Sequence, residues 1–322
     1  MSREMRRTEK PRVGISACLL GQTVRYDGGH KRDQFLTHVL GRYVDWVPVC
    51  PELEVGMGVP REPVRLVGST KDPRMIAEHS HTDWTDKMQA YARRRVTALA
   101  SMRLDGYVFK KDSPSCGVER VRVYGMHGVA TREGKGLFAR ALTDRIPLLP
   151  TEEEGRLSDL RLRENFVERI FAHHRWQRLL EERPSPRRLV EFHARHKLLL
   201  LAHSESHLRR LGRLVARAGK GPLPPILQQY GAVFMQGLSV PATTRKHANA
   251  LEHMMGYFSR QIESGERAEL VEIVREYRRG RLPLVVPITL IHHYLNKFRV
   301  AYLLKQVYLD PDPRELMLRN QV

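Results

Sequence analysis

The first half of the chain alternates short apolar runs with segments in which apolar residues recur at helical spacing. Short runs predict buried strands, which we expect at residues 13–17, 44–49, 106–110 and 146–149. Helical spacing predicts helices at residues 33–43 and 85–103. Strands and helices that alternate at these lengths are typical of a parallel sheet with crossover helices. We therefore expect residues 11–150 to form an α/β domain with a Rossmann-like open parallel sheet, preceded by a basic arm over residues 1–10.

The second half of the chain carries a different pattern. Residues 151–183 are rich in Glu and Arg and predict a charged helical linker, which Pro184 and Pro186 end. Beyond the linker, strand alternation is absent from the sequence. Helical periodicity occurs in the segments 187–203, 204–218, 224–237, 244–263, 266–279 and 287–304. We therefore expect a mostly α-helical domain over residues 184–322.

Composition adds an expected class of partner to this two-domain picture. The 322 residues are 41% hydrophobic and 28% charged, which is ordinary for a globular protein. Lys and Arg number 55 against 36 Asp and Glu, so the formal net charge is +19. Residues 184–322 alone carry 22 basic and 11 acidic side chains. An excess of this size attracts polyanions, and nucleic acid is the partner that it predicts.

Hydropathy and cysteine content indicate the cellular compartment in which the protein is expected. A bilayer span needs about 18 to 20 apolar residues, and the best run, residues 282–291, is interrupted by Pro283 and Pro287. No apolar region follows the basic arm, so an export signal is not expected. Three cysteines in a chain of this kind argue against a disulfide framework. We expect a cytoplasmic protein with no membrane contact.

The positions of the three cysteines predict a shared site. Cys18, Cys50 and Cys116 each follow an expected strand by a few residues. Ligands of open parallel sheets collect beyond the carboxyl ends of the strands, so the thiols should converge there. The sequence has no CxxC pair, which leaves open an iron-sulfur cluster with one open iron, a catalytic zinc with three thiolates and water, or a single nucleophilic cysteine.

The segments around the cysteines form three polar, glycine-containing blocks. They read Ser16-Ala-Cys-Leu-Leu-Gly21 with Val24-Arg-Tyr-Asp-Gly28, Val49-Cys-Pro-Glu52 with Gly58-Val-Pro-Arg-Glu-Pro63, and Lys110-Lys-Asp-Ser-Pro-Ser-Cys-Gly117. In this order, over residues 11–150, they closely resemble the thiouracil desulfidase family. That resemblance implies a small α/β domain that holds a [4Fe-4S] cluster and removes sulfur from thiolated pyrimidines.

The remainder of the chain, roughly residues 186–322, resembles the YbgA-like helical domain. The residues that carry this resemblance are Glu191-Phe-His-Ala-Arg-His-Lys197, Asn249-Ala-Leu-Glu-His-Met-Met-Gly-Tyr257, Pro283-Leu and Leu318-Arg-Asn320. Two-domain proteins of this arrangement resemble tRNA desulfidases that convert 4-thiouridine back to uridine. The resemblance therefore implies that the helical domain binds tRNA, in agreement with its charge.

The family resemblance also implies roles for individual residues. It makes Cys18, Cys50 and Cys116 the ligands of the cluster, with one iron left open to bind the sulfur of the substrate. It places Glu52 and Ser113 beside that iron. A carboxylate there can act as the general base for a water molecule that attacks the carbon, while a hydroxyl can hold or protonate the ring nitrogen.

Other residues in the same blocks are candidates for supporting roles. The roles of general base and general acid can be assigned to Glu52 and Ser113 in either order. Asp112 is a third candidate for the acid. Substrate contacts are expected from Arg25, Tyr26, Lys110 and Lys111, because cations can meet phosphate and aromatic rings can stack on a base.

The implied function is therefore that of an enzyme that releases hydrogen sulfide from 4-thiouridine in tRNA. Two alternatives remain at this point. One is desulfidation of free thiouracil or a thionucleoside. The other is a nonenzymatic RNA-binding or redox-sensing protein whose cluster only reports oxygen or iron.

Overall fold

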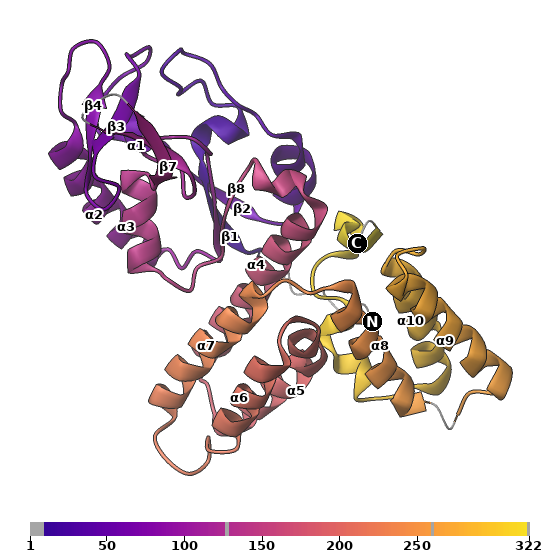
Figure 1. The fold of residues 1–322 in the computed structure, drawn as a ribbon. Coiled ribbons are helices and arrows are strands. Elements are labelled where there is room, and N and C mark those ends of the chain that lie inside the picture. Colours follow the sequence, from indigo (N-terminus) through magenta and orange to yellow (C-terminus); the bar gives the residue numbers. More distant parts are fainter. Residues whose placement is uncertain (1–9, 126–128, 259–260, 321–322) are drawn as a thin grey trace, which may run out of the picture. The chain divides into compact units, whose positions relative to one another are not determined.

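The computed structural model describes residues 10–125, 129–258 and 261–320. The chain divides into two compact units, Met1–Ser158 and Asp159–Val322. We call them the α/β unit and the helical unit; strands lie in the first, and the second is drawn as helices in magenta to yellow (Figure 1). The expected basic arm, residues 1–10, lies outside the described residues except for Lys10.

The α/β unit contains the expected parallel sheet. Its strand order is β2-β1-β5-β8, and every pairing within it is parallel. The strands are β1 (Arg12–Ser16), β2 (Asp45–Val49), β5 (Gly106–Phe109) and β8 (Thr151–Glu153). The first three strands match the short apolar runs that the sequence predicted as strands. Each of them buries Val or Ile side chains, which explains the apolar runs. The expected α/β fold class is confirmed.

The fourth strand lies later in the chain than the sequence predicted. Residues 146–149 form a turn, in which the Leu149 amide donates to the carbonyl of Ile146. Pro147 and Pro150 have no amide hydrogen, so this apolar run cannot complete a strand ladder. The pairing with β5 is made by β8, whose side chains include two buried glutamates.

A second, mixed sheet was not predicted. Its order is β4-β3-β6-β7, with β3 (Val64–Gly68), β4 (Pro73–Ala77), β6 (Val121–Tyr124) and β7 (Ala130–Gly134). The pairs β3–β4 and β6–β7 are antiparallel, whereas β3–β6 is parallel. Residues 51–68, for which the sequence predicted neither helix nor strand, contain α1 (Pro51–Glu54) and β3. These strands are short and partly exposed, so their apolar pattern is weak.

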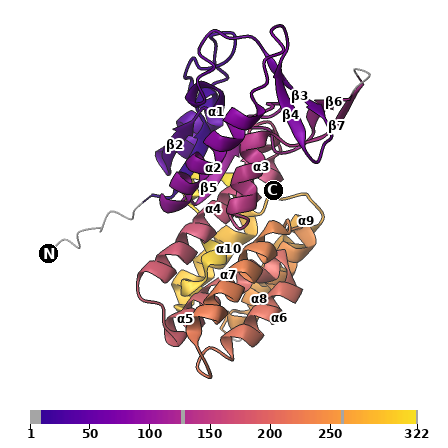
Figure 2. The same ribbon diagram turned by 90° about the vertical axis from the view of Figure 1, so that its left-hand side faces the viewer.

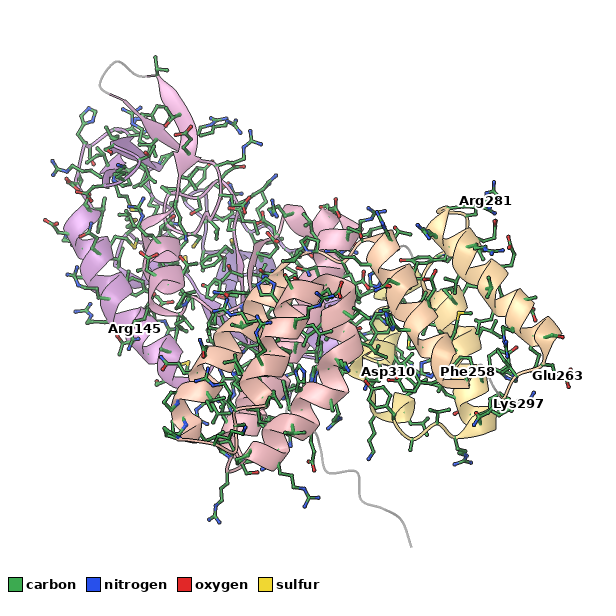
Figure 3. The ribbon with its side chains drawn as sticks, turned by 60° about the horizontal axis from the view of Figure 1, so that its bottom comes forward. Arg145, Phe258, Glu263, Arg281, Lys297 and Asp310 are labelled. Carbon is green, nitrogen blue, oxygen red and sulfur yellow. The ribbon has the colours of Figure 1, made fainter. Side chains whose placement is uncertain are left out.

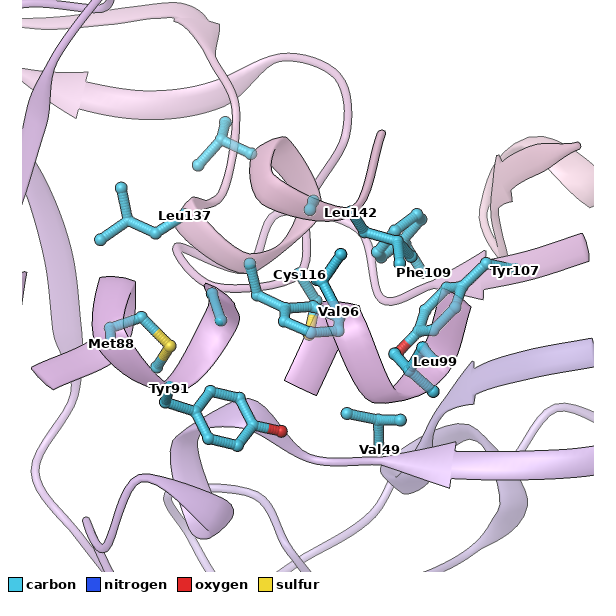
Figure 4. Packing of buried hydrophobic residues seen from close by; sticks show 14 of the residues in the cluster. Val49, Met88, Tyr91, Val96, Leu99, Tyr107, Phe109, Cys116, Leu137 and Leu142 are labelled. Atoms are coloured by element: carbon cyan, nitrogen blue, oxygen red, sulfur yellow. The ribbon is translucent and has the colours of Figure 1, made fainter. Parts of the chain in front are cut away.

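Two helices cover the hydrophobic core of the α/β unit (Figure 4). They are α2 (Thr85–Ser101), close to the predicted helix at 85–103, and α3 (Leu137–Arg145). The core cluster joins the buried face of α2 to β5 and to the loop that carries Cys116, which is only 4% exposed. The segment 33–43, predicted as a helix, is helical over most of its length, as a π-helix over Phe35–Val39 followed by a 3-10 helix over Leu40–Arg42.

The described residues of the helical unit form seven α-helices and several short 3-10 turns (Figure 2). They include no strand. The helices are α4 (Leu160–Glu181), α5 (Pro186–His203), α6 (Glu205–Val215), α7 (Leu223–Ser239), α8 (Thr244–Phe258), α9 (Ser264–Arg278) and α10 (Val285–Phe298). The segment treated as a linker, residues 151–183, is shared between the units: β8 belongs to the first and α4 to the second.

Specific contacts fix the ends of several helices. Ser185 accepts a hydrogen bond from the Arg188 amide and so caps α5, with Pro186 in the first turn. Lys297 near the end of α10 donates to Glu266 in the first turn of α9, and Figure 3 shows Lys297 beside Glu263. None of the helices in the described part of the chain is long and apolar enough to cross a membrane.

A buried cluster of charges ties the last turn of the chain to α4. Arg319 lies in the turn Leu318–Asn320, with its guanidinium 3.4 Å from both Glu164 and Glu168 and over the ring of Tyr308. His203 donates to the other oxygen of Glu168. Burial alone would raise the pKa of Glu168, but His203 and Arg319 lower it to about 2. Both glutamates are thus packed around one arginine.

We expect Arg319→Met to destabilise the helical unit strongly, because it removes the buried cation between Glu164 and Glu168 and leaves Glu168 with His203 alone. Loss of one partner of a buried ion pair costs about 3–5 kcal/mol, which corresponds to a fall of roughly 10 °C in Tm for a unit of this size. Thermal unfolding followed by circular dichroism measures the shift. Arg278→Met on α9, where the side chain is exposed, is the matched control and should leave Tm within about 2 °C. Equal Tm values for the two variants would contradict the importance of this cluster.

Candidate functional site

All ten residues singled out from the sequence line one cavity of the α/β unit. The cavity has a volume of about 330 Å³ and lies at the carboxyl ends of β1, β2 and β5. Its walls include Cys18, Cys50, Cys116, Glu52, Asp112, Ser113, Arg25, Tyr26, Lys110 and Lys111. The structure thus brings together segments that are as much as 98 residues apart in the chain, as between Cys18 and Cys116.

Two of the thiols are placed by the turns that directly follow strands. Cys18 lies in the turn Ala17–Leu20 after β1, and the carbonyl of Cys18 accepts hydrogen bonds from the amides of Gly21 and Lys31. Cys50 follows β2 and occupies the cap of α1, where its amide donates to the Glu54 carboxylate at 3.1 Å. Backbone pairing therefore decides where both sulfurs lie.

The third thiol lies on a tight loop pinned by α3. Carbonyls of the loop accept the amides at the start of α3, among them Pro114 from Leu137 and Ser115 from Phe138. A Cβ on Gly117 would lie 2.4 Å from Val121 and 2.9 Å from the Ser113 carbonyl, so only glycine fits beside Cys116. This close packing holds the Cys116 thiol against the cavity.

Burial raises the pKa of all three thiols. The pKa of Cys18 rises to about 11 for this reason, although the nearby Lys110 ammonium opposes the rise. The pKa values of Cys50 and Cys116 are also raised by burial, and Cys50 adds to the rise at both other thiols. Three thiolates can therefore be stable together in this cavity only when they bind a centre of multiple positive charge.

Within the described part of the chain, no group of three or more His, Cys, Asp or Glu side chains is close enough together to hold a single metal ion. The three thiols line one cavity of about 330 Å³.

Glu52 is held in one orientation by hydrogen bonds from two sides. Arg61 donates to Oε2 at 2.5 Å, and its side chain is only 6% exposed. Ser115 donates to Oε1 at 2.7 Å, and Ser113 lies 3.4 Å from the same oxygen. Arg61 is itself fixed by the carbonyls of Val24 and Gly58. The carboxylate is therefore oriented toward the cavity wall that carries Cys116.

Ser113 and Ser115 form a small network with the third cysteine. Their hydroxyls lie 3.0 Å apart, and Ser113 Oγ accepts the Cys116 amide at 3.1 Å. Ser115 Oγ lies 3.6 Å from the sulfur of Cys116. The carboxylate, the two hydroxyls and the thiol thus form one connected wall.

Two of the remaining cationic candidates are paired with neighbouring carboxylates. Lys110 Nζ binds Glu154 at 2.6 Å, and Arg25 binds Asp27 at 3.1 Å while its guanidinium lies over the ring of Tyr26. The backbone at Asp112 has φ +57, which turns the chain sharply between Lys111 and Ser113. Asp112 is exposed, whereas Ser115 is buried against Glu52.

Sequence reasoning assigned no role to Arg61 or Ser115, although both are in the blocks around the cysteines. The available signals were modest: Arg61 is the arginine of Gly58-Val-Pro-Arg-Glu-Pro63, and Ser115 directly precedes a cysteine. Their contacts with Glu52 join segments 9 and 63 residues apart, so they depend on the fold.

Known proteins resemble this chain in both halves. A family model described as 2-thiouracil desulfurase matches residues 13–154, and a second model, described as a protein of unknown function (DUF1722), matches residues 197–313. The uncharacterized protein YbgA of Escherichia coli (strain K12) is 39% identical over 153 residues, which are 47% of this chain and 90% of that protein. The uncharacterized protein YbbK of Bacillus subtilis (strain 168) is 29% identical over 108 residues, which are 32% of this chain and 71% of that protein.

One similar protein has a solved structure. It is the [4Fe-4S]-dependent thiouracil desulfidase TudS, which is 30% identical. The match covers 49% of this chain and 100% of that chain, with a TM-score of 0.39.

We expect Gly117→Ala to destabilise the α/β unit, because its methyl group would push Val121 and the Ser113 carbonyl away from the Cys116 loop. Overpacking of this kind lowers the free energy of unfolding by about 1–3 kcal/mol. Gly125→Ala is the control, since among the described residues its Cβ would meet only the Val129 carbonyl, at an ordinary 3.5 Å. Chemical unfolding of both variants measures the difference. A Gly117→Ala protein as stable as the Gly125→Ala protein would show that the loop has room.

Proposed function

This chain belongs to the 2-thiouracil desulfurase family and carries a YbgA-like helical domain behind the family's own domain, and on that basis we propose that it is a desulfidase of 4-thiouridine in tRNA. The coarser activity, removal of sulfur from a thiolated pyrimidine, follows from the family. The products would be the pyrimidine carbonyl and hydrogen sulfide. The observation that carries the proposal is one cavity that gathers all three cysteines with Glu52 inside the region matched by the family model.

The residues of the cavity fit an iron-sulfur cluster. Cys18, Cys50 and Cys116 are the chain's three cysteines, and all lie on this wall, as soft donors that iron prefers. They would hold a [4Fe-4S] cluster by three of its irons. When bound, such a cluster would supply an iron without a protein thiolate, a Lewis acid with affinity for the sulfur of a thiocarbonyl.

Glu52 is the residue best placed to activate water. Its carboxylate would take a proton from the water molecule that attacks the ring carbon bearing sulfur, so that a C–O bond forms as the C–S bond breaks. Arg61 and Ser115 act as positioning residues, because they fix both carboxylate oxygens. The proton taken by Glu52 would pass to the departing sulfur. The overall reaction is a hydrolysis and needs no external electron donor.

Ser113 and the surrounding cations would orient the substrate. Ser113 Oγ is within reach of Glu52 and can donate to or accept from the ring nitrogen of the pyrimidine. Tyr26 offers an aromatic surface for the base, and Arg25, Lys110 and Lys111 offer positive charge for a phosphate. Asp112, which is exposed at the rim, is the third candidate for a proton donor.

The helical unit supports RNA as the carrier of the thiolated base. Residues on and just after α6 form a basic surface, which we call the α6 surface. It consists of the exposed side chains Arg210, Arg213, Arg217 and Lys220. Buried Leu211 and Leu214 occupy the opposite face of the same helix, so the cations point outward. Phosphate contacts of this kind give affinity without sequence readout.

We expect Glu52→Gln to lower the rate of desulfidation by about 10²–10⁴-fold, because an amide cannot take the proton from water. The enzyme is mixed with thiolated tRNA under anaerobic conditions. The rate is measured from the loss of thiocarbonyl absorbance and from the release of sulfide. Iron and acid-labile sulfide should stay at the level of the unchanged protein. Glu62→Gln, outside the cavity, is the matched control and should retain full activity.

Two outcomes of this experiment would contradict the proposal. Full activity of Glu52→Gln would remove the carboxylate from the mechanism. A cluster-loaded protein without any turnover on tRNA or free 4-thiouracil would instead favour a sensor or an RNA-binding protein.

We expect the double variant Arg210→Gln, Arg213→Gln to lose activity on thiolated tRNA but not on free 4-thiouracil. Two phosphate contacts fewer should lower the slope of log affinity against log salt by about two. Measurement of kcat/KM on both substrates between low and moderate salt separates the two effects. Unchanged kinetics on tRNA would indicate that the α6 surface does not bind RNA, and activity on free 4-thiouracil alone would favour the small-molecule alternative.

A further inference from the structure

The helical unit contains a groove with a volume of about 790 Å³, in addition to the cavity of the α/β unit. It is built by α4, α5 and the chain that follows α10, including the turns Leu303–Lys305 and Val307–Leu309. The groove is of the size that holds a ligand such as a nucleotide. The residues that give it chemical character are Arg175, Arg195, Lys305, Tyr302, Glu191 and Asp310.

The charges in the groove leave an excess of positive charge. Glu191 is bound by Arg187 at 3.0 Å, and Asp310 is bound by Arg314. Arginines outside the groove thus offset both of its carboxylates; Asp310 is labelled in Figure 3. Arg195 and Lys305 are exposed, and their side chains belong to the groove wall. The wall therefore attracts an anion.

Arg175 adds a buried charge behind this wall. Its Nε donates to His196 at 3.2 Å and its Nη1 to the Pro311 carbonyl at 2.7 Å, while its buried Nη2 has no hydrogen-bond partner among the described residues. Burial holds the pKa of His196 well below its usual range, so the ring is neutral. Both hydrogen-bond acceptors of Arg175 are therefore uncharged, and the carboxylates of Glu168 and Asp312 favour its charged form from further away. An anion in the groove would stabilise the guanidinium.

The groove wall also contains an aromatic ring and several apolar side chains. Tyr302 is half-buried and stacks on Tyr257, with ring centroids 4.9 Å apart. Ala194 and Ala301 lie in the same groove. A flat aromatic side chain next to clustered cations suits a ligand that has both a planar base and a phosphate.

We propose that this groove binds a nucleotide, with its phosphate at Arg195 and Lys305 and its nucleoside beside Tyr302. The site is separate from the sulfur-removing cavity and does not depend on the desulfidase activity. The same nucleotide chemistry can come from a free nucleotide or from a residue of an RNA strand. The proposal concerns the shared chemistry, and the probes below distinguish the two sources.

The test is a calorimetric titration of the full-length protein with uridine 5′-monophosphate, with uridine as the probe that lacks the phosphate. We expect the monophosphate to bind at least tenfold more tightly than uridine. Arg195→Gln and Lys305→Gln should each weaken its binding by about tenfold, since each removes one charge-assisted contact. Arg278→Gln on α9 is the matched control and should bind as the unchanged protein does. Thermal unfolding confirms that each variant is folded.

A single-stranded uridine hexanucleotide identifies the source of the ligand. Tighter binding of the hexanucleotide than of the monophosphate, with the same sensitivity to Arg195→Gln, supports an RNA strand in the groove; weaker binding supports a free nucleotide. The proposal is overturned if uridine 5′-monophosphate does not bind, or if Arg195→Gln and Lys305→Gln bind it as tightly as Arg278→Gln does. Activity of Arg195→Gln on free 4-thiouracil should stay unchanged, so a failure here is distinct from a failure of the desulfidase proposal.

Discussion

The parallel pairing of β1 with β2 on one side and with β5 on the other positions the whole candidate site. In this register Ser16 lies opposite Val49, and Ile15 lies opposite Val108. Each strand therefore ends at the same edge of the sheet, and each continues into a segment that carries one cysteine. An antiparallel β2 or β5 would direct its cysteine to the opposite edge. The backbone hydrogen bonds of one sheet thus bring three distant thiols to a common cavity.

Arginine has two distinct uses in this chain, and net charge does not distinguish them. Arg61 and Arg319 are largely buried and bind carboxylates, so they hold Glu52 on the site wall and Glu168 in the helical unit. The arginines of the α6 surface are exposed and available to a partner. Only the second group contributes to attraction of a polyanion at the surface. The formal charge of +19 is therefore a coarse measure of how much of the protein can bind nucleic acid.

The sequence was informative wherever a pattern is local. Apolar runs located β1, β2 and β5, and helical spacing located α2 and the helices of the second unit. The mixed sheet was missed because strands such as β7, which is almost entirely exposed, need no apolar alternation. The strand that pairs with β5 was misplaced because the more apolar run at 146–149 contains Pro147 and is followed by Pro150. At the candidate site, the cysteines were predicted from their positions after strands and Glu52 from the family resemblance, whereas the contacts of Arg61 and Ser115 with Glu52 form only across the fold.

Cys116 belongs at once to the cavity wall and to the hydrophobic core of the α/β unit. Oxidation of its thiol to a sulfinate would put a negative charge among aromatic and aliphatic side chains, where a charge without a partner is very costly. A molecule damaged in this way would lose its packing together with its chemistry. Because cells degrade unfolded chains, oxidation of this one thiol in the cavity wall would also shorten the lifetime of the protein.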